Sequence, residues 1–344
     1  MSEGKVHYRY LGSSGLKVSV PILGAMSFGS PEWAKWVLDE EQSMEILNAA
    51  WDVGINTIDT ANEYSDGESE RIIGKFMQQH RIPRSRIVIA TKCFHPVAPR
   101  PGMPYTEYSR LRDTRDFQNQ YGLSRTAIFN AVDASLERLQ TSYIDLLQIH
   151  RYDPHVRAEE TMKALHDLVQ MGKVRYIGAC SMRAWQFAYL NEIAEKHGWT
   201  KFVSMQSEYS LLYREEEREM ISYCKFNGIG VIPWAPVAGG LLARALSSEE
   251  SLRSSASKGM PWERTLTDAD QEIVKRVEQV ARRRGKLMVQ IALAWSAGKI
   301  TSPIVGTSSV QRLGENVDID WKLSDEEVEY LEEPYQPKPV RGHD

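Results

Sequence analysis

The sequence has little cysteine, no metal-binding motif and no long apolar run. Its three cysteines, Cys93, Cys180 and Cys224, are widely spaced, and no CxxC pair or cysteine–histidine cluster occurs. This pattern excludes a disulfide framework and a structural zinc site, and it predicts reduced thiols in a cytoplasmic protein. No apolar run approaches the length of a membrane span, and the opening MSEGKVHYRYLG lacks the apolar core of a secretory signal. We therefore expect neither a membrane nor a metal as a partner.

An excess of charge of one sign is also missing. The 42 lysines and arginines oppose 46 aspartates and glutamates, which gives a formal net charge of −4. This balance gives no reason to expect nucleic acid as a partner. The glycine-rich motif GxGxxG follows none of the apolar runs, and this absence disfavours a doubly wound dinucleotide-binding sheet.

What the sequence does contain is one pattern that repeats along the chain. Short apolar or β-branched runs end in polar residues, and amphipathic helical stretches follow them. The runs predict eight strands, at residues 21–26, 56–61, 87–93, 144–150, 176–181, 203–210, 230–237 and 302–307. The helical stretches include residues 39–54, 124–140, 158–173, 214–228, 268–285 and 286–298. Eight strands that alternate with helices predict an α/β fold of the (β/α)8 TIM barrel type.

Further segments flank or interrupt this barrel pattern. Residues 6–20, VHYRYLGSSGLKVSV, predict a β-hairpin before the first barrel strand. No linker divides the chain, so we expect a single domain over residues 1–344, with a core at about 8–331 and a loosely attached tail at 332–344. Two connections, 94–123 and 238–267, are too long for plain turns and predict long rim loops that are either functional lids or disordered segments.

Polar residues end three successive strands of the predicted barrel. Asp59 ends the second strand and is followed by Tyr64, Lys92 ends the third, and His150 ends the fourth. Because active sites of such barrels lie at the carboxyl ends of the strands, these side chains should converge. Taken singly, Asp59 and Lys92 could be only a buried ion pair, and His150 only a core histidine.

Together the four groups suit acid–base chemistry at a carbonyl group. A phenol has a pKa of about 10, and we expect the Lys92 cation to lower the pKa of Tyr64 while Asp59 holds Lys92 charged. Tyr64 would then be the general acid for a carbonyl that receives a hydride, and His150 would orient the carbonyl oxygen.

The sequence closely resembles the aldo-keto reductase superfamily. The shared stretches run in family order from about residue 9 to residue 331: GINTIDTANEYSDGESE, IATK, DLLQIHR, KVRYIGACS, SMQSEYS, PWAPVAGGLL and PIVGTSSVQRLGEN. The arrangement is most similar to the fungal members related to aryl-alcohol dehydrogenases and versiconal-type polyketide reductases. The resemblance implies an enzyme of secondary metabolism that reduces an aromatic or polyketide-type aldehyde or ketone to an alcohol. It implies the tetrad Asp59, Tyr64, Lys92 and His150, with Tyr64 as the proton donor.

The resemblance also implies an NADPH/NADP+ cofactor that lies extended across the barrel mouth. The nicotinamide end would contact Gly24, Met26, Asp59, Ser181, Gln206 and Trp234. The pyrophosphate would lie against the loop at residues 237–241, through Val237, Gly239 and Leu241, since glycines allow close approach. The adenosine end would contact Ser308, Arg312, Glu315 and Asn316. Arg312 would pair with the 2′-phosphate, which favours NADP over NAD.

The sequence departs from the family pattern at two places. Met182 stands where many members carry an asparagine after the serine of the fifth strand, so one carboxamide contact is lost or supplied by another group. Gly306 and Thr307 stand where many members carry a lysine before the arginine of the 2′-phosphate site. The second departure weakens the expected preference for NADP without removing it.

The substrate side is expected to be built from aromatic and cationic residues of the rim loops. The main candidates are Trp33, Phe94 and Arg151, and the further ones are Trp36, Tyr105, Tyr108 and Tyr152. Aromatic side chains at a barrel mouth suit a flat aromatic aldehyde or a polyketide ketone.

Two alternatives to a carbonyl reductase remain open at this stage. A Schiff-base aldolase would use Lys92 as its nucleophile. A regulatory barrel that binds NADP without turnover, like the potassium-channel β-subunits of the superfamily, would keep the same tetrad.

Overall fold

The computed structural model describes residues 6–99, 103, 108–248, 255–256 and 263–343. Eight parallel strands form one sheet in the order β10-β3-β4-β5-β6-β7-β8-β9. The strands are β3 (Ile22–Gly24), β4 (Thr57–Asp59), β5 (Val88–Cys93), β6 (Ile144–Ile149), β7 (Val174–Cys180), β8 (Ser204–Gln206), β9 (Gly230–Val231) and β10 (Ile304–Gly306). Each lies within or overlaps a predicted strand, so the barrel prediction is confirmed.

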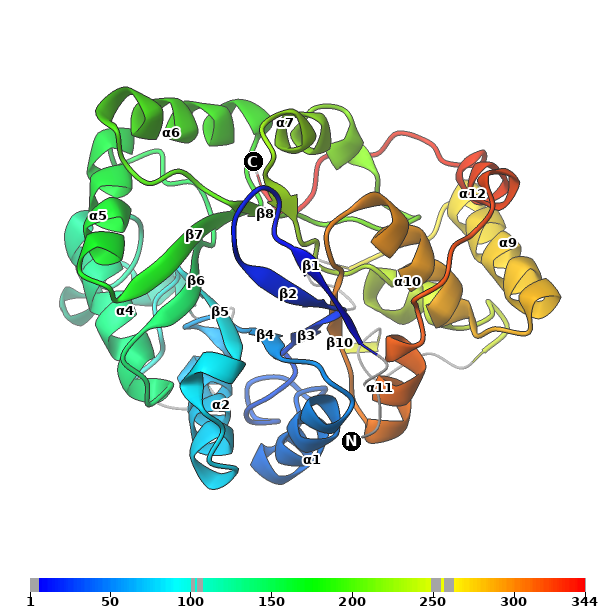
Figure 1. Ribbon diagram of the computed structural model, residues 1–344, viewed down its shortest axis with the longest axis horizontal. Coiled ribbons are helices and arrows are strands. Elements are labelled where there is room, and N and C mark those ends of the chain that lie inside the picture. The colour runs from blue at the N-terminus through cyan, green and yellow to red at the C-terminus, as the bar shows by residue number, and fades with distance from the viewer. Residues whose placement is uncertain (1–5, 100–102, 104–107, 249–254, 257–262, 344) are drawn as a thin grey trace.

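Backbone hydrogen bonds bring the two edge strands of this sheet together. The amide of Ile304 donates to the carbonyl oxygen of Pro233 at 2.9 Å, and the amide of Thr301 donates to that of Val231 at 3.0 Å. The sheet therefore curls back on itself, and the helices lie around it (Figure 1). The carboxyl ends of all eight strands face the same side, which we call the barrel mouth.

Several helices begin at a capping residue. Asp39, Ser124, Thr267 and Ser324 each accept a hydrogen bond from a backbone amide of the first turn. The helices are α1 (Glu40–Asp52), α2 (Glu68–Gln79), α3 (Tyr108–Leu111), α4 (Arg125–Arg138), α5 (Ala158–Gln170), α6 (Ala184–His197), α7 (Met220–Phe226), α9 (Asp268–Arg284), α10 (Met288–Lys299), α11 (Val310–Val317) and α12 (Asp325–Glu332). Neither these nor any other described helix is long and apolar enough to cross a membrane.

The helix predicted at residues 214–228 is shorter than expected. A 3-10 turn, Glu215–Glu217, comes first, and α7 begins only at Met220. Glu219 has φ −140° and ψ −53°, which interrupts the helical path between the two. The acidic side chains of the turn are held by other segments and by near neighbours: Glu215 contacts the distant Tyr335, and Glu217 contacts the nearby Tyr209 and Arg214.

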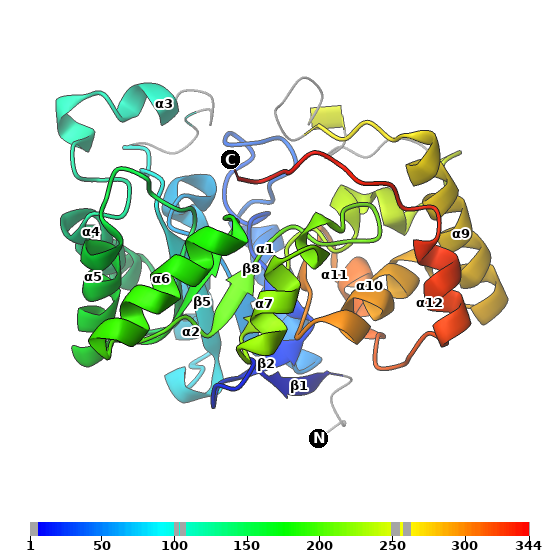
Figure 2. The ribbon, with the colours of Figure 1, turned by 90° about the horizontal axis from the view of Figure 1, so that it is seen from above.

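The predicted hairpin is present and fills the end of the barrel opposite the mouth (Figures 1 and 2). It consists of β1 (His7–Tyr10) and β2 (Lys17–Val20), which pair antiparallel. Leu11 and Val18 pack inside the barrel in one buried cluster with Ile22, Ala90, Leu146, Ile232 and Ile304. Gly12 has φ +59°, and a Cβ there would lie 2.2 Å from the carbonyl oxygen of Gly228, so only glycine fits this close approach.

The C-terminal tail was predicted to be loosely attached, and this prediction is wrong for the described residues. Figure 2 shows the segment after α12 crossing the mouth end of the barrel. Tyr335 Oη donates to Glu215 Oε1 at 2.7 Å and accepts from the amide of Arg214 at 2.8 Å. The amide of Lys338 donates to the same carboxylate at 2.8 Å, and the amide of Arg341 donates to Tyr213 Oη at 2.9 Å. These polar contacts join positions more than a hundred residues apart, so no local pattern reveals them.

Candidate active site

The barrel brings Asp59, Tyr64 and Lys92 into direct contact. Asp59 ends β4, Lys92 lies near the end of the neighbouring strand β5, and Tyr64 begins the short 3-10 turn Tyr64–Gly67. Lys92 Nζ donates to Asp59 Oδ1 at 2.5 Å, to the carbonyl oxygen of Thr60 at 2.9 Å and to Tyr64 Oη at 3.2 Å. Lys92 is fully buried, so its ammonium group makes these three contacts in place of water.

His150 completes the group from the end of β6. Its ring centroid lies 6.1 Å from that of Tyr64, with the two planes at 79°. The side chain is buried, and it follows β6 directly, one strand over from Lys92. The four residues predicted to act together therefore lie around one point of the barrel mouth.

Lys92 lowers the pKa of Tyr64 as expected, but burial outweighs this effect and the net shift is upward. Burial raises the pKa of Tyr64 to about 12, although the Lys92 cation lowers it. Burial opposes the charge of Lys92, but Asp59 and Tyr64 outweigh it and raise the pKa of Lys92. At neutral pH the phenol is therefore protonated and the amine charged. The desolvation of Tyr64 cannot be read from the sequence, and it is the largest contribution to the pKa of this residue.

Asp59 has two further partners, and sequence analysis missed one of them. Its Oδ2 accepts from Gln206 Nε2 at 2.8 Å and from Gln148 Nε2 at 2.9 Å. Gln206 also donates to Gln148 Oε1 at 2.9 Å, so its amide nitrogen faces Asp59 and Gln148. The signal for Gln148 was available, because it is an amide within the otherwise apolar end of the strand, LLQI. The network fixes the carboxylate that holds Lys92.

Glu63 and His95 are two further site residues that sequence analysis missed. Glu63 Oε1 lies 3.3 Å from His150 Nδ1, and Glu63 Oε2 lies 3.9 Å from His95 Nδ1. All three side chains are buried. A glutamate directly before Tyr64 was the available signal, but nothing local shows that it points at a histidine from another strand.

The residues expected at the nicotinamide end gather beside this group. Trp234 Nε1 donates to Ser181 Oγ at 3.1 Å. Gly24 pairs with Gly306 of β10 and with Asp59 of β4, and Met26 is 36% exposed just beyond β3. The tail also reaches this place, because a Cβ built on Gly342 would lie 3.1 Å from Trp234 Cζ2.

The loop expected at the pyrophosphate is a distorted 3-10 segment, Ala238–Ala243. Gly239 and Gly240 have φ of 69° and 100° there, which favours glycine. Val237 and Leu241 anchor the loop, since both pack against the main hydrophobic core. Arg244 Nε donates to the carbonyl oxygen of Gly240 at 3.2 Å and was not singled out from the sequence.

The residues expected at the adenosine end lie on α11 and just before it. Arg312 is exposed, and its Nη1 donates to Ser308 Oγ at 2.6 Å. Burial and the neighbouring charge of Arg312 lower the pKa of Arg244, so two cations share this region. Glu315 lines a recess together with Arg244 and Met288, and Asn316 is buried.

The candidate substrate residues lie on several different loops and helices around the barrel. Trp33 and Trp36 meet edge to face with centroids 6.2 Å apart, and Phe94 packs on His95 at 5.0 Å. Arg151 Nη1 donates to the carbonyl oxygen of His150 at 2.6 Å, which holds it at the mouth. Of the remaining candidates, Tyr152 contacts Trp185, and Tyr108 begins α3. Tyr105 lies outside the described residues.

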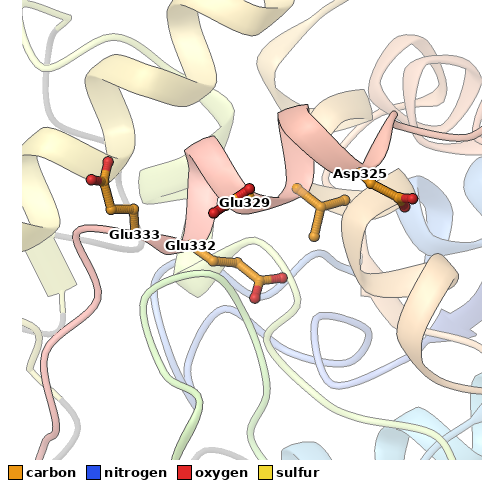
Figure 3. Close-up of a pocket in the computed structure, with 5 residues that line it drawn as sticks. Asp325, Glu329, Glu332 and Glu333 are labelled. Atoms are coloured by element: carbon orange, nitrogen blue, oxygen red, sulfur yellow. The ribbon is translucent and has the colours of Figure 1, made fainter.

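A second recess lies along α12, away from the mouth (Figure 3). It is lined by Val328 and by four acidic residues, Asp325, Glu329, Glu332 and Glu333. Two of these carboxylates already pair with cations: Glu332 with Arg214 and Lys299, and Glu333 with Arg276. These pairs stabilise the fold, and none of the residues predicted for the site lies there.

Comparisons with known proteins show the family to which the chain belongs. The family model described as "Aldo/keto reductase family" matches residues 22–336. An aldo-keto reductase of Fusarium vanettenii is 52% identical over 100% of this chain and 95% of its own length. A putative aryl-alcohol dehydrogenase of Schizosaccharomyces pombe is 51% identical over 97% of each chain. Versiconal hemiacetal acetate reductase of Aspergillus parasiticus is 48% identical over 97% of this chain and 98% of its own. The chain therefore belongs to the aldo/keto reductase family of oxidoreductases.

Proposed function

We propose that the protein is an NADPH-dependent carbonyl reductase in which Tyr64 donates the proton. The observation that carries the proposal is the contact of Tyr64 Oη with the buried Lys92 ammonium at 3.2 Å, with Asp59 behind it. A protonated phenol beside a fixed cation is suited to give its proton to an oxygen that is gaining negative charge. The cation then stabilises the phenolate that remains.

The chain's own residues divide the work of reduction. When bound, a reduced nicotinamide supplies the hydride that reaches the carbonyl carbon. His150 orients the carbonyl oxygen, and Tyr64 transfers its proton to that oxygen, so the product is the alcohol. Lys92 holds the tyrosinate, and Asp59, fixed by Gln148 and Gln206, holds Lys92 in place. The high pKa of Tyr64 keeps the proton available at neutral pH.

The residues present fit an extended nicotinamide dinucleotide. Gly239 and Gly240 present backbone without side chains, which allows a pyrophosphate to approach closely. Trp234 and Ser181 offer an aromatic face and a hydroxyl at the mouth. Gly342 is the exception, because it lies against both residues and must move before a ring can stack there.

The phosphate end supports NADP over NAD. Arg312 and Arg244 lie close enough for their charges to affect one another, and Ser308 adds a hydroxyl. Guanidinium groups bind phosphate through paired hydrogen bonds, and NAD has no 2′-phosphate to use them.

We propose that the substrates are aromatic or polyketide-type carbonyl compounds. The aromatic contacts of Trp33 with Trp36 and of Tyr152 with Trp185 support a flat substrate. The names of two relatives, a putative aryl-alcohol dehydrogenase and versiconal hemiacetal acetate reductase, support similar chemistry here, and we propose a role in secondary metabolism. The three cysteines are buried and free, which supports a cytoplasmic location.

Lys92 is poorly suited to the aldolase alternative. A Schiff-base lysine needs an accessible neutral amine, whereas Lys92 is fully buried, contacts Asp59 and has a raised pKa.

The proposal is tested by NADPH oxidation, followed by absorbance, with a panel of aryl aldehydes, aryl ketones and quinones, and with NADH in parallel. Turnover with NADPH and little with NADH is expected. Tight NADPH binding without any turnover would instead favour a regulatory barrel, and an absence of binding would contradict the cofactor site.

A further inference from the structure

Glu63 and His150 form a buried contact that the proposed mechanism does not use. Glu63 Oε1 lies 3.3 Å from His150 Nδ1, and the two residues are 5% and 6% exposed. Glu63 Oε2 and His150 Nδ1 have no hydrogen-bond partner among the described residues. Because a buried polar atom without a partner is costly, a proton shared between Glu63 Oε1 and His150 Nδ1 is the expected way to satisfy the ring nitrogen.

We propose that Glu63 is a positioning residue whose carboxyl group decides which nitrogen of His150 carries the ring proton. The inference rests on the proposed carbonyl reduction. A protonated Glu63 donates to Nδ1, and the ring then keeps its own proton on Nε2, where it can donate to a carbonyl oxygen. A carboxylate at Glu63 instead accepts from Nδ1, and Nε2 becomes an acceptor that suits the hydroxyl of an alcohol.

The surroundings of the pair allow both states near neutral pH. Burial raises the pKa of Glu63 to about 7, although Arg151, Lys92 and Arg112 lower it. Burial also lowers the pKa of His150 well below its ordinary value, so the ring is neutral and its two tautomers compete. The charged and titratable groups that face Glu63 are His150, His95, Lys92, Arg112, Arg151, Asp66 and Tyr64.

The direction of the pH effect follows from these states. Below about pH 7 Glu63 carries its proton, so Nε2 of His150 is a donor and reduction is favoured. As the pH rises through that value, Glu63 loses its proton and Nε2 becomes an acceptor. We therefore expect kcat/KM for carbonyl reduction to fall, and that for alcohol oxidation to rise, across the same interval.

Two simpler roles for the cluster agree less well with the geometry. The ligand atoms of Glu63, His95 and His150 lie within 4.8 Å of one another, as the ligands of a metal ion do. However, Arg112 Nη2 lies 3.2 Å from His95 Nδ1, and Lys92 and Arg151 add positive charge, which opposes a divalent cation. A glutamate that only balances these cations would leave the tautomer of His150 independent of pH.

Nitrogen-15 NMR of histidine-labelled, full-length protein tests the proposal without any turnover. The signals of His150 are identified by their loss in His150→Asn. In the wild type we expect His150 to pass from the Nε2–H to the Nδ1–H form as the pH rises through about 7. Glu63→Gln should show one form throughout, and Glu63→Asp should keep the transition at a shifted pH. The proposal is overturned if Glu63→Gln keeps the wild-type transition, or if Glu63→Asp loses it.

Kinetics provide the second readout, and Asp145→Asn provides the matched control. Asp145 is another buried carboxyl with a raised pKa, but it lies at the start of β6 and pairs with Arg84. Glu63→Gln should remove the fall of kcat/KM near neutral pH, whereas Asp145→Asn should keep it. If the wild type reduces no carbonyl compound, the proposed function fails, and the NMR transition still decides the role of Glu63.

Discussion

Gly342 lies directly against the indole of Trp234: a Cβ built on Gly342 would be 3.1 Å from Cζ2 of the ring. The same atom would be 3.6 Å from Ser181 Oγ. Both neighbours belong to the proposed nicotinamide site. The backbone just before Gly342 is held by the hydrogen bond from the amide of Arg341 to Tyr213. A ligand that stacks on Trp234 must therefore displace the last residues of the chain.

Removal of residues 340–344 should consequently tighten NADPH binding. If the displaced contacts are worth about 1.4 kcal/mol, the dissociation constant falls about tenfold. Fluorescence titration of the truncated and complete proteins measures it. Gly342→Ala should act in the same direction because the added methyl group meets Trp234, whereas Gly298→Ala, with open space around it, should not. Weaker binding after truncation would show instead that the tail covers the bound cofactor.

Tyr64→Phe should remove the proton donor while leaving the cofactor contacts intact. We expect kcat for reduction to fall roughly 100- to 10,000-fold, the range attributed to general acid catalysis, with little change in NADPH affinity. The matched control is Tyr143→Phe, because Tyr143 precedes β6 and contacts Arg84 away from the mouth. A Tyr64→Phe enzyme that retained near-normal kcat would contradict the mechanism.

Asp59→Asn should destabilise the protein because it leaves the Lys92 charge buried without its counterion. Breaking one side of a buried ion pair costs about 3 to 5 kcal/mol, so the urea midpoint should fall clearly. Lys92→Met should cost less, because Gln148 and Gln206 still donate to Asp59.

The double variant Asp59→Asn/Lys92→Met completes this thermodynamic cycle. Its loss of stability should be smaller than the sum of the two single losses, since neither charge is then left alone. Lys201→Met, which breaks an exposed pair with Glu195, should change the free energy of unfolding by less than about 1 kcal/mol. Strict additivity at Asp59 and Lys92 would mean that the two side chains are not energetically coupled.

Arg312→Ala should weaken NADPH binding and leave NADH binding nearly unchanged. Hydrogen bonds to charged groups are worth about 1.5 to 3 kcal/mol, which corresponds to roughly 10- to 150-fold in affinity. Arg244→Ala should act in the same direction. Arg86→Ala, a change at an exposed position just before β5, is the control. Equal loss of NADPH and NADH affinity would show that Arg312 does not select the 2′-phosphate.

The sequence predicted the parts of the fold that depend on local patterns. Apolar runs and helical spacing of apolar residues placed the strands and most helices, because these patterns repeat within a few residues. The barrel topology then placed Asp59, Lys92 and His150 at one end. That step needs only the rule that the carboxyl ends of the parallel strands lie at the same end of the barrel.

The rest depends on contacts between distant segments. The partnership of Glu63 with His150 joins loops after two different strands, and the attachment of Tyr335 to Glu215 spans 120 residues. The net rise in the pKa of Tyr64 arises from desolvation, which depends on how completely the surrounding side chains exclude water. A residue's type and order in the chain carry none of this information.

The β1–β2 hairpin closes the barrel at the end opposite the mouth, so the barrel is open only at the mouth. Leu11 and Val18 fill the bottom, and the tail crosses the rim. A substrate must therefore enter, and its product must leave, through the barrel mouth. With the proposed cofactor extended across the mouth, we expect it to bind before the substrate and to leave after the product. Product-inhibition patterns would test this order of binding.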